Sequence, residues 1–129
     1  MAISLDWERV AVLMGGWTPE ASVSRVSASF CGQAARNAGW DAVEIEVDRD
    51  IAAKLAEFKP GRVFNALHGQ IGEDGNIQGL LNIMNIPYTH SGLAASAIAM
   101  DKILAKTMLA DCGILVPPTL PLAEDTHVY

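Results

Sequence analysis

Side chains that could take part in chemistry stand at three places in this 129-residue chain where a turn or loop is predicted to lead into a helix: Glu20, His68 and Lys102. A carboxylate can bind a ligand ammonium group, an imidazole at a strand end lies where α/β sheets bind ligands, and a lysine can contact a phosphate. Each also has a plainer interpretation: a first-turn acid favoured by the helix dipole, a structural histidine, and a solvated lysine. Residue types alone do not decide between these interpretations.

The glycine pair Gly15-Gly16 precedes the first of these residues, between an expected strand and an expected helix. Glycine permits a tight turn and a close approach of the backbone to a ligand. The pair does not complete a dinucleotide fingerprint, which needs glycines at G-x-G-x-x-G spacing, and there is no phosphate loop of the form G-x-x-x-x-G-K-[ST]. Glu46 and Asp48 could imitate a ribose-binding acid, but without those glycines the signal is weak. The turn alone therefore fits a ligand site or a plain strand–helix connection.

Residues 64–81 give the strongest local signal, because an apolar run ends at His68, continues through a glycine-rich loop and enters an amphipathic pattern. This order places the imidazole at the carboxyl end of a strand, where open α/β sheets bind ligands. Glu73 and Asp74 are expected to be acids at the N-terminus of the next helix. A metal site could be built from His68, Glu73, Asp74 and His90, but their spacing matches no zinc pattern, and we expect no metal site there.

Strands and helices alternate along the chain with short connections. Period-two and continuous apolar runs predict strands over 9–14, 42–47, 62–67 and 86–89. Helical spacing predicts helices over 21–38, 51–58 and 77–84. Two further helices are expected: a fourth that Ser91 caps, and a fifth that Asp101 opens or continues and that ends near Cys112. The apolar stripe expected on the first helix consists of Val23, Val26, Phe30 and Ala34. The buried face expected on the last helix consists of Leu104, Met108, Leu109 and Cys112. The alternation predicts an α/β fold with an open, mostly parallel sheet and helices on both faces.

Composition narrows the classes of function. The net charge of −6 argues against nucleic acid or an anionic membrane as a partner. Acidic residues interrupt the apolar start, so no signal peptide is expected, and no apolar run is long enough to span a bilayer. Cys31 and Cys112 are expected to be buried, reduced thiols of a cytosolic protein. The proline-containing segment 114–122 predicts a linker into a further domain and hence a fragment, the alternative being a tail strand on the sheet edge.

Several motifs occur in the order found in D-alanine–D-alanine ligases, members of the ATP-grasp superfamily. They are Gly15-Gly16, Glu20, Val23-Ser24, the Asn-Ala-Leu-His-Gly of 65–69, the Gly-Glu-Asp-Gly of 72–75, Gln78-Gly79, 86–89, Ser91-Gly92 and the Met-Asp-Lys of 100–102. From Val10 to about Pro118 the chain resembles the N-terminal part of that family. The resemblance implies a Rossmann-like pre-ATP-grasp domain over 1–99, followed over 100–129 by the first helix and linker of a central ATP-grasp domain.

The resemblance also implies a chemistry for the site. In this family ATP phosphorylates the carboxylate of one D-alanine, the amine of a second D-alanine attacks, and Mg²⁺ neutralises the phosphates. Glu20 matches the acid that binds the first ammonium group, and His68 matches the histidine near its carboxylate. Lys102 matches a lysine near the ATP phosphates, and Gly15 and Gly16 shape the first-substrate pocket. The family's magnesium ligands and adenine pocket have no counterpart here, so we expect no metal ligand in this chain and no catalytic activity from it alone.

The resemblance further implies a cytoplasmic homodimer that serves peptidoglycan precursor synthesis. One departure stands in the motif itself, since Ala21-Ser22 replaces the family's usual Arg-Glu and removes a charge pair from the turn. Two other classes of function stay open: a stand-alone module that binds a small amino acid, and a dimerisation module without catalysis. An ATP-grasp ligase with another amino-acid substrate is a nearer alternative.

Overall fold

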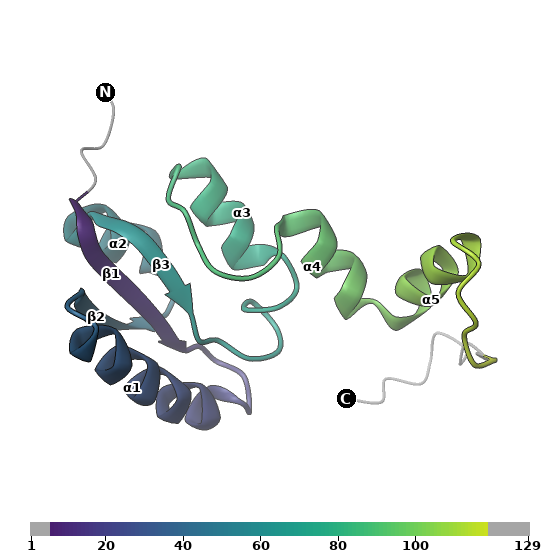
Figure 1. Ribbon diagram of the computed structural model, residues 1–129, viewed down its shortest axis with the longest axis horizontal. Helices are drawn as coiled ribbons and strands as arrows, with labels where there is room; N and C mark the ends of the chain where they lie inside the picture. The colour runs from purple at the N-terminus through teal and green to yellow at the C-terminus, as the bar shows by residue number, and fades with distance from the viewer. Residues whose placement is uncertain (1–5, 119–129) are drawn as a thin grey trace.

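The computed structural model describes residues 6–118, in which strands and helices alternate before two helices follow in succession (Figure 1). The elements are β1 (Asp6–Gly15), α1 (Ala21–Asn37), β2 (Asp41–Val47), α2 (Ile51–Phe58), β3 (Pro60–Asn65), α3 (Asn76–Ile83), α4 (Leu93–Met100) and α5 (Lys102–Asp111). The predicted elements are thus present, most within a few residues of their expected ends. We call residues 6–90 the α/β unit and residues 93–118 the helical arm.

The sheet is parallel with strand order β2-β1-β3, so β1 is central. The strand expected over 86–89 is a single parallel bridge from Tyr88 to Val63 at the free edge of β3. Its two hydrogen bonds run from the Val63 N–H to the Pro87 carbonyl and from the Thr89 N–H to the Val63 carbonyl. Pro87 has no N–H to extend the ladder, which accounts for its position at an edge.

Helices cover both faces of the sheet, which confirms the predicted fold class (Figure 1). Successive residues of β1 point to opposite faces. Ala11 and Leu13 belong to the larger core beneath α2 and α3, whereas Val10 and Val12 belong to a smaller core beneath α1. The larger core is completed by Val47, Ile51, Leu55, Val63, Leu67, Ile77, Leu81 and Ile86.

The face that α1 turns to the sheet is not the predicted one. Val23 and Val26 are each 57% exposed and Phe30 is 75% exposed, and Ala34 is also exposed. The buried residues of α1 are instead small: Ala21, Ser24, Ala28 and Gly32. These recur at helical spacing as well, and their size lets the helix backbone lie close to the strands. The sequence pattern therefore identified the helix correctly and its buried face wrongly.

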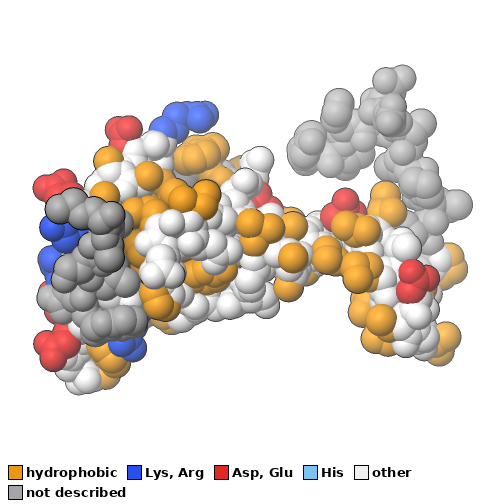
Figure 2. All heavy atoms as spheres, turned by 90° about the horizontal axis from the view of Figure 1, so that it is seen from above, with side chains coloured by type: hydrophobic (Ala, Val, Ile, Leu, Met, Phe, Trp, Pro, Cys, Tyr) orange, Lys and Arg blue, Asp and Glu red, His pale blue; other side chains and the backbone are white. Residues whose placement is uncertain are grey.

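The helical arm extends from the α/β unit, with α5 on the far side of α4 from the sheet (Figure 1). Hydrophobic side chains lie open along it, as Figure 2 shows. The buried face predicted for the last helix is wrong, because Leu104, Met108, Leu109 and Cys112 are all exposed. No described residue packs over that stripe to bury it, and α5 contains no buried residue.

The caps of the arm helices differ from one another. The predicted cap Ser91 is wrong, since Gly92 takes the N-cap position of α4 and no side chain caps it. The Ser91 carbonyl instead accepts a hydrogen bond from the Ser96 hydroxyl at 3.3 Å. Asp101 opens α5 as predicted, and its carboxylate accepts from the N–H groups of Ile103 and Leu104.

The two cysteines are both free thiols. Cys31 is half-buried, whereas Cys112 is exposed, so its predicted burial is wrong. Within residues 6–118, no helix is both long and apolar enough to cross a membrane.

Candidate functional site

A buried serine fixes the turn between β1 and α1. Gly15 and Gly16 have φ of 79° and 85°, a left-handed conformation that glycine adopts without steric cost. The Gly15 N–H donates to Ser24 Oγ at 2.9 Å, and that hydroxyl donates to the Ala66 carbonyl at 2.8 Å. Ser24, which is fully buried, thus ties the end of β1 to α1 and to the segment after β3. This tie sets the distance between the glycine turn and the residue pair His68-Gly69.

The carboxylate of Glu20 reaches across to the segment that carries His68. Glu20 stands at the N-cap position of α1 and is exposed. A methyl group added to Gly69 would lie 1.8 Å from Glu20 Oε2, so the carboxylate rests directly against that glycine. Gly69 also has a φ of 66°. The structure therefore brings together Glu20 and the neighbour of His68, from segments far apart in the sequence.

The imidazole of His68 is held by the same helix. His68 Nε2 lies 3.2 Å from the hydroxyl of Ser27, in a half-buried contact. Glu20 and Ser27 are seven residues apart, which places them on one side of α1. They therefore flank the pair His68-Gly69 from a single rigid element, at the carboxyl ends of β1 and β3.

The loop after His68 is ordered by its own two acids. Glu73 Oε2 accepts from the Gly69 N–H at 2.6 Å, and Asp74 accepts from the N–H groups of Ile71 and Asn76, each at 3.0 Å. Partial burial acts to raise the pKa of Asp74, but these N–H groups and the Asn76 amide outweigh it and hold the pKa below its ordinary value. Both acids precede α3, which begins at Asn76. Asp74 accepts from the first N–H of that helix, as an acid at a helix N-terminus does, whereas Glu73 binds the loop backbone, so the prediction is wrong for Glu73.

Two buried amides hold the middle of that loop. The side-chain amides of Asn65 and Gln78 donate to the Gly72 carbonyl at 2.8 and 2.7 Å. The Leu67 N–H donates to Asn65 Oδ1 at 3.1 Å. Gly72 packs so tightly that an added methyl group would lie 2.3 Å from Leu67 Cβ. The loop that presents His68 is therefore anchored at both ends and at its centre.

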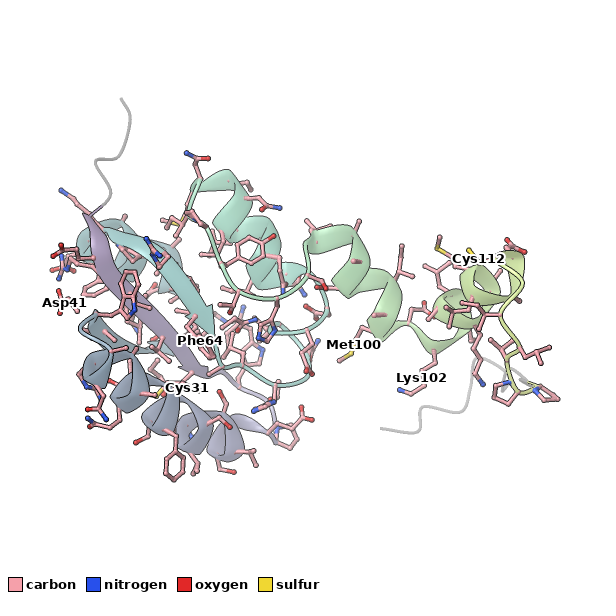
Figure 3. The ribbon with its side chains drawn as sticks, in the orientation of Figure 1. Cys31, Asp41, Phe64, Met100, Lys102 and Cys112 are labelled. Atoms are coloured by element: carbon pink, nitrogen blue, oxygen red, sulfur yellow. The ribbon has the colours of Figure 1, made fainter. Side chains whose placement is uncertain are left out.

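Lys102 is not brought to this site. It is the first residue of α5, exposed, and lies on the helical arm away from the strand ends (Figure 3). The two acids considered as ribose ligands make ion pairs instead, Glu46 with Arg25 at 2.6 Å and Asp48 with Lys54. Among residues 6–118, no group of three or more His, Cys, Asp and Glu side chains is placed to hold a metal ion.

Four polar residues of the site region were not proposed from the sequence as site residues: Ser24, Ser27, Asn65 and Gln78. Ser24, Asn65 and Gln78 appeared there only as parts of motifs. One signal could have identified Ser24, Asn65 and Gln78: each is a polar side chain at a position that a helix or strand buries. Ser27 is half-buried and gives no such signal.

Comparison with known proteins agrees with this architecture. The model of a family described as "D-ala D-ala ligase N-terminus" matches residues 47–91. A D-alanine–D-alanine ligase from Azorhizobium caulinodans is 53% identical over 110 residues, which are 85% of this chain and 36% of that enzyme. The ligase of Zymomonas mobilis is 54% identical over 112 residues, which are 87% of this chain and 35% of that enzyme. The chain thus spans about a third of the length of the curated relatives it matches.

Solved structures give the same result. The crystal structure of D-alanine–D-alanine ligase from Bacillus anthracis complexed with ATP superposes with a TM-score of 0.79 at 30% identity, over 94% of this chain and 42% of that one. The ligase from Aeromonas hydrophila gives a TM-score of 0.76 at 29% identity, over 92% and 51%. The chain therefore belongs to the D-alanine–D-alanine ligase family, and its sequence corresponds to the N-terminal part of those enzymes.

Proposed function

We propose that this chain supplies the N-terminal part of the first D-alanine site of an ATP-dependent ligase that joins two D-alanines for peptidoglycan precursor synthesis. The observation that carries the proposal is the placement of the Glu20 carboxylate against Gly69, beside His68, at the carboxyl ends of β1 and β3. D-Alanine has an ammonium group and a carboxylate on one carbon atom. A site that recognises it needs an acid and a hydrogen-bond donor close together, and Glu20 and His68 meet that need.

Each residue has an atom available for the ligand. Within residues 6–118 the Glu20 carboxylate has no ion-pair partner, so it can bind an ammonium group. His68 uses Nε2 for Ser27, which leaves Nδ1 for the ligand carboxylate. We propose that the Gly15-Gly16 turn closes the pocket at the side of β1, because its left-handed φ angles favour glycine, which lets the backbone approach a ligand closely. The Ala21-Ser22 replacement leaves Glu20 without the neighbouring charges of the usual motif.

ATP and Mg²⁺ belong to the proposed reaction, but residues 6–118 form no site for the metal ion. No cluster of ligands for a metal ion occurs among residues 6–118, and Lys102 lies on the arm rather than beside Glu20 and His68. We therefore assign no step of phosphoryl transfer to the described residues. We propose Lys102 as a contact for an ATP phosphate. We also propose that residues 1–99 form the N-terminal α/β domain and that residues 100–129 belong to a central ATP-grasp domain. The proposal also includes a cytoplasmic homodimer and no nucleic acid or membrane as partner.

Binding of D-alanine tests the proposal most directly. We expect the purified chain to bind D-alanine more tightly than L-alanine in an NMR titration, and Glu20→Gln to weaken binding about ten- to a hundredfold, because a charged hydrogen bond is lost. Glu57→Gln is the matched control, since Glu57 is an exposed acid on α2. Equal loss in both variants, or none in Glu20→Gln, would contradict the assignment of Glu20.

A second candidate function is a stand-alone module that binds a small amino acid. It is favoured by the fact that Glu20, Ser27 and His68 come together within the described residues alone. Sequencing the source gene past the codon for Tyr129 separates the two candidates. A reading frame that continues into glycine-rich and acidic motifs supports the ligase, whereas a stop codon there favours the module.

A further inference from the structure

The hydroxyl of Ser27 makes an unusual contact for a serine inside a helix. Serine and threonine on helices commonly donate to the backbone carbonyl four residues earlier. Thr107 of α5 does so, donating to the Ile103 carbonyl at 2.9 Å. Ser27 instead lies 3.2 Å from His68 Nε2, and its hydroxyl makes no other hydrogen bond within residues 6–118. Its contact is therefore directed out of the helix, at the proposed site.

The chemistry of the ligand determines what this contact must do. A carboxylate only accepts hydrogen bonds, so the imidazole nitrogen that faces it has to carry a proton. A neutral imidazole has one N–H, and its other nitrogen is an acceptor that needs a donor. With Nδ1 toward the ligand, Nε2 is that acceptor, and the Ser27 hydroxyl is the donor within reach.

A hydroxyl also suits both charge states of the ring. It donates to Nε2 when the imidazole is neutral and accepts from Nε2–H when the imidazole is protonated. Ser27 can therefore keep the ring in one orientation in either charge state.

We infer that Ser27 is a positioning residue that donates to His68 Nε2, fixes the ring, and places the proton of the neutral imidazole on Nδ1 for the carboxylate of the ligand. This inference rests on the proposed function for the identity of the ligand, a small amino acid. It assigns to α1 a double role, since one helix side presents Glu20 to the ammonium group and, through Ser27, orients His68 toward the carboxylate. Ser27 itself is not required to touch the ligand.

The test is a long-range ¹H–¹⁵N NMR spectrum of the whole ¹⁵N-labelled chain without ligand, at a pH where the imidazole is neutral. The chain has three histidines, and His68→Gln identifies the signals of His68. We expect the wild-type ring to be mainly the Nδ1–H tautomer. Ser27→Ala is expected to shift it to the Nε2–H form, which predominates in free histidine, and Ser27→Thr is expected to keep the Nδ1–H form. Ser29→Ala, the same change at an exposed position of α1, is expected to leave it unaltered.

Binding of D-alanine gives a second readout. We expect Ser27→Ala to weaken it about three- to tenfold, the size of one neutral hydrogen bond, and Ser27→Thr to restore it. A wild-type Nε2–H tautomer, or a tautomer unchanged in Ser27→Ala, would overturn the inference. If the wild-type chain does not bind D-alanine, the proposed function fails, while the tautomer comparison still decides the role of Ser27.

Discussion

The helical arm has a higher proportion of apolar side chains than the α/β unit but buries far fewer of them. In the α/β unit, Leu13, Leu55 and Leu81 are almost completely buried between sheet and helices. In the arm the only buried residue of either helix is Ser96, while its large apolar side chains are exposed. Those exposed side chains are Leu93, Met100, Ile103, Leu104, Met108, Leu109, Ile114 and Leu115. Helical periodicity therefore specifies a helix in both regions, but burial requires a second element to pack against.

The difference has an energetic consequence. A helix of 10 residues such as α5 is shorter than the roughly 12–15 residues that an isolated helix needs to be even marginally stable in water. Tertiary packing supplies most of the stability of helices in proteins, and the described residues supply little of it to the arm. The α/β unit should therefore unfold as one cooperative unit, and the arm should open separately at lower cost.

Matched leucine truncations should give the largest contrast. Leu13 is 0% exposed and Leu109 is 42% exposed. We expect Leu13→Ala to lower the free energy of unfolding by about 2–5 kcal/mol, because it leaves a cavity beneath α2 and α3. Leu109→Ala should change it by less than about 0.5 kcal/mol. Urea denaturation followed by tryptophan fluorescence measures both, since Trp17 and Trp40 lie in the α/β unit. Equal effects would mean that the arm is packed as well as the core.

Matched glycine substitutions come next. Gly69 and Gly39 both have positive φ, 66° and 92°, but an added methyl group meets Glu20 at Gly69 and nothing within 4 Å at Gly39. Gly39→Ala should cost about 1–2 kcal/mol from the left-handed conformation alone. Gly69→Ala should cost more, and should also abolish the binding of D-alanine because the carboxylate of Glu20 must move. Thermal denaturation and an NMR titration check the two results.

Gly113→Ala places the same strain in the arm, where φ is 77° and the space is open. The unfolding of the α/β unit should then not change, although α5 should lose order at its C-terminus. A fall in stability as large as that of Gly39→Ala would show that the two regions unfold together.

The sequence predicted the order and type of the elements because their periodicities are local. Every strand and helix was located, and Pro87 correctly indicated an edge. The buried faces of α1 and α5 were wrong for opposite reasons. On α1, the small residues that allow close packing carry a weaker pattern than Val23, Val26 and Phe30, which face solvent. On α5, the pattern was sound but no described element packs against it.

The site was only partly predictable. Glu20 and His68 were identified through motif order, and the contact of Glu20 with Gly69 fits their pairing, although the roles proposed for them remain predictions. Ser24 and Ser27 were missed because each finds its partner more than 40 positions away in the sequence. A serine in a helix shows nothing of such a partner until the sheet has brought the two segments together. Glu73 was expected at the N-terminus of a helix but binds the loop backbone, because an acidic loop and an acidic first turn have the same composition.

A smaller and local effect is expected at the caps. Asp101 caps α5 through two N–H groups, whereas Asp50 holds the N-cap position of α2 without a side-chain cap. Asp101→Ala should destabilise α5 by about 1 kcal/mol, and Asp50→Ala should affect α2 by only a few tenths. Hydrogen exchange measures this, through the amides of Ile103 and Leu104 that lose their acceptor. If the arm opens separately, as we expect, hydrogen exchange of the β1 amides should stay unchanged in Asp101→Ala. Faster exchange of those amides would contradict the separate unfolding of the two regions.

The smallest expected effect is a pH dependence confined to the α/β unit. Among residues 6–118, three carboxyl groups have a lowered pKa. Hydrogen bonds with Arg36 lower the pKa of Glu44, a hydrogen bond with Lys54 lowers that of Asp48, and at Asp74 the loop hydrogen bonds outweigh the effect of burial. A carboxyl whose pKa is lower in the folded state stabilises the fold above its unfolded pKa, and this contribution is lost as the pH falls through the folded value.

For Asp74 the loss therefore begins near its ordinary pKa of 3.8 and continues below it. We expect the free energy of unfolding of the wild-type chain to fall as the pH falls from about 4 downward. The fall should be shallower in Asp74→Asn, because that variant has no carboxylate whose protonation would weaken the hydrogen bonds from the N–H groups of Ile71 and Asn76. Asp111→Asn is the control on the arm, where the exposed carboxylate should not affect unfolding of the α/β unit. Urea denaturation at each pH gives the slopes. If Asp111→Asn flattened the profile as much as Asp74→Asn, the arm would contribute to the cooperative unit, because only a group whose surroundings change in that transition can alter its pH dependence.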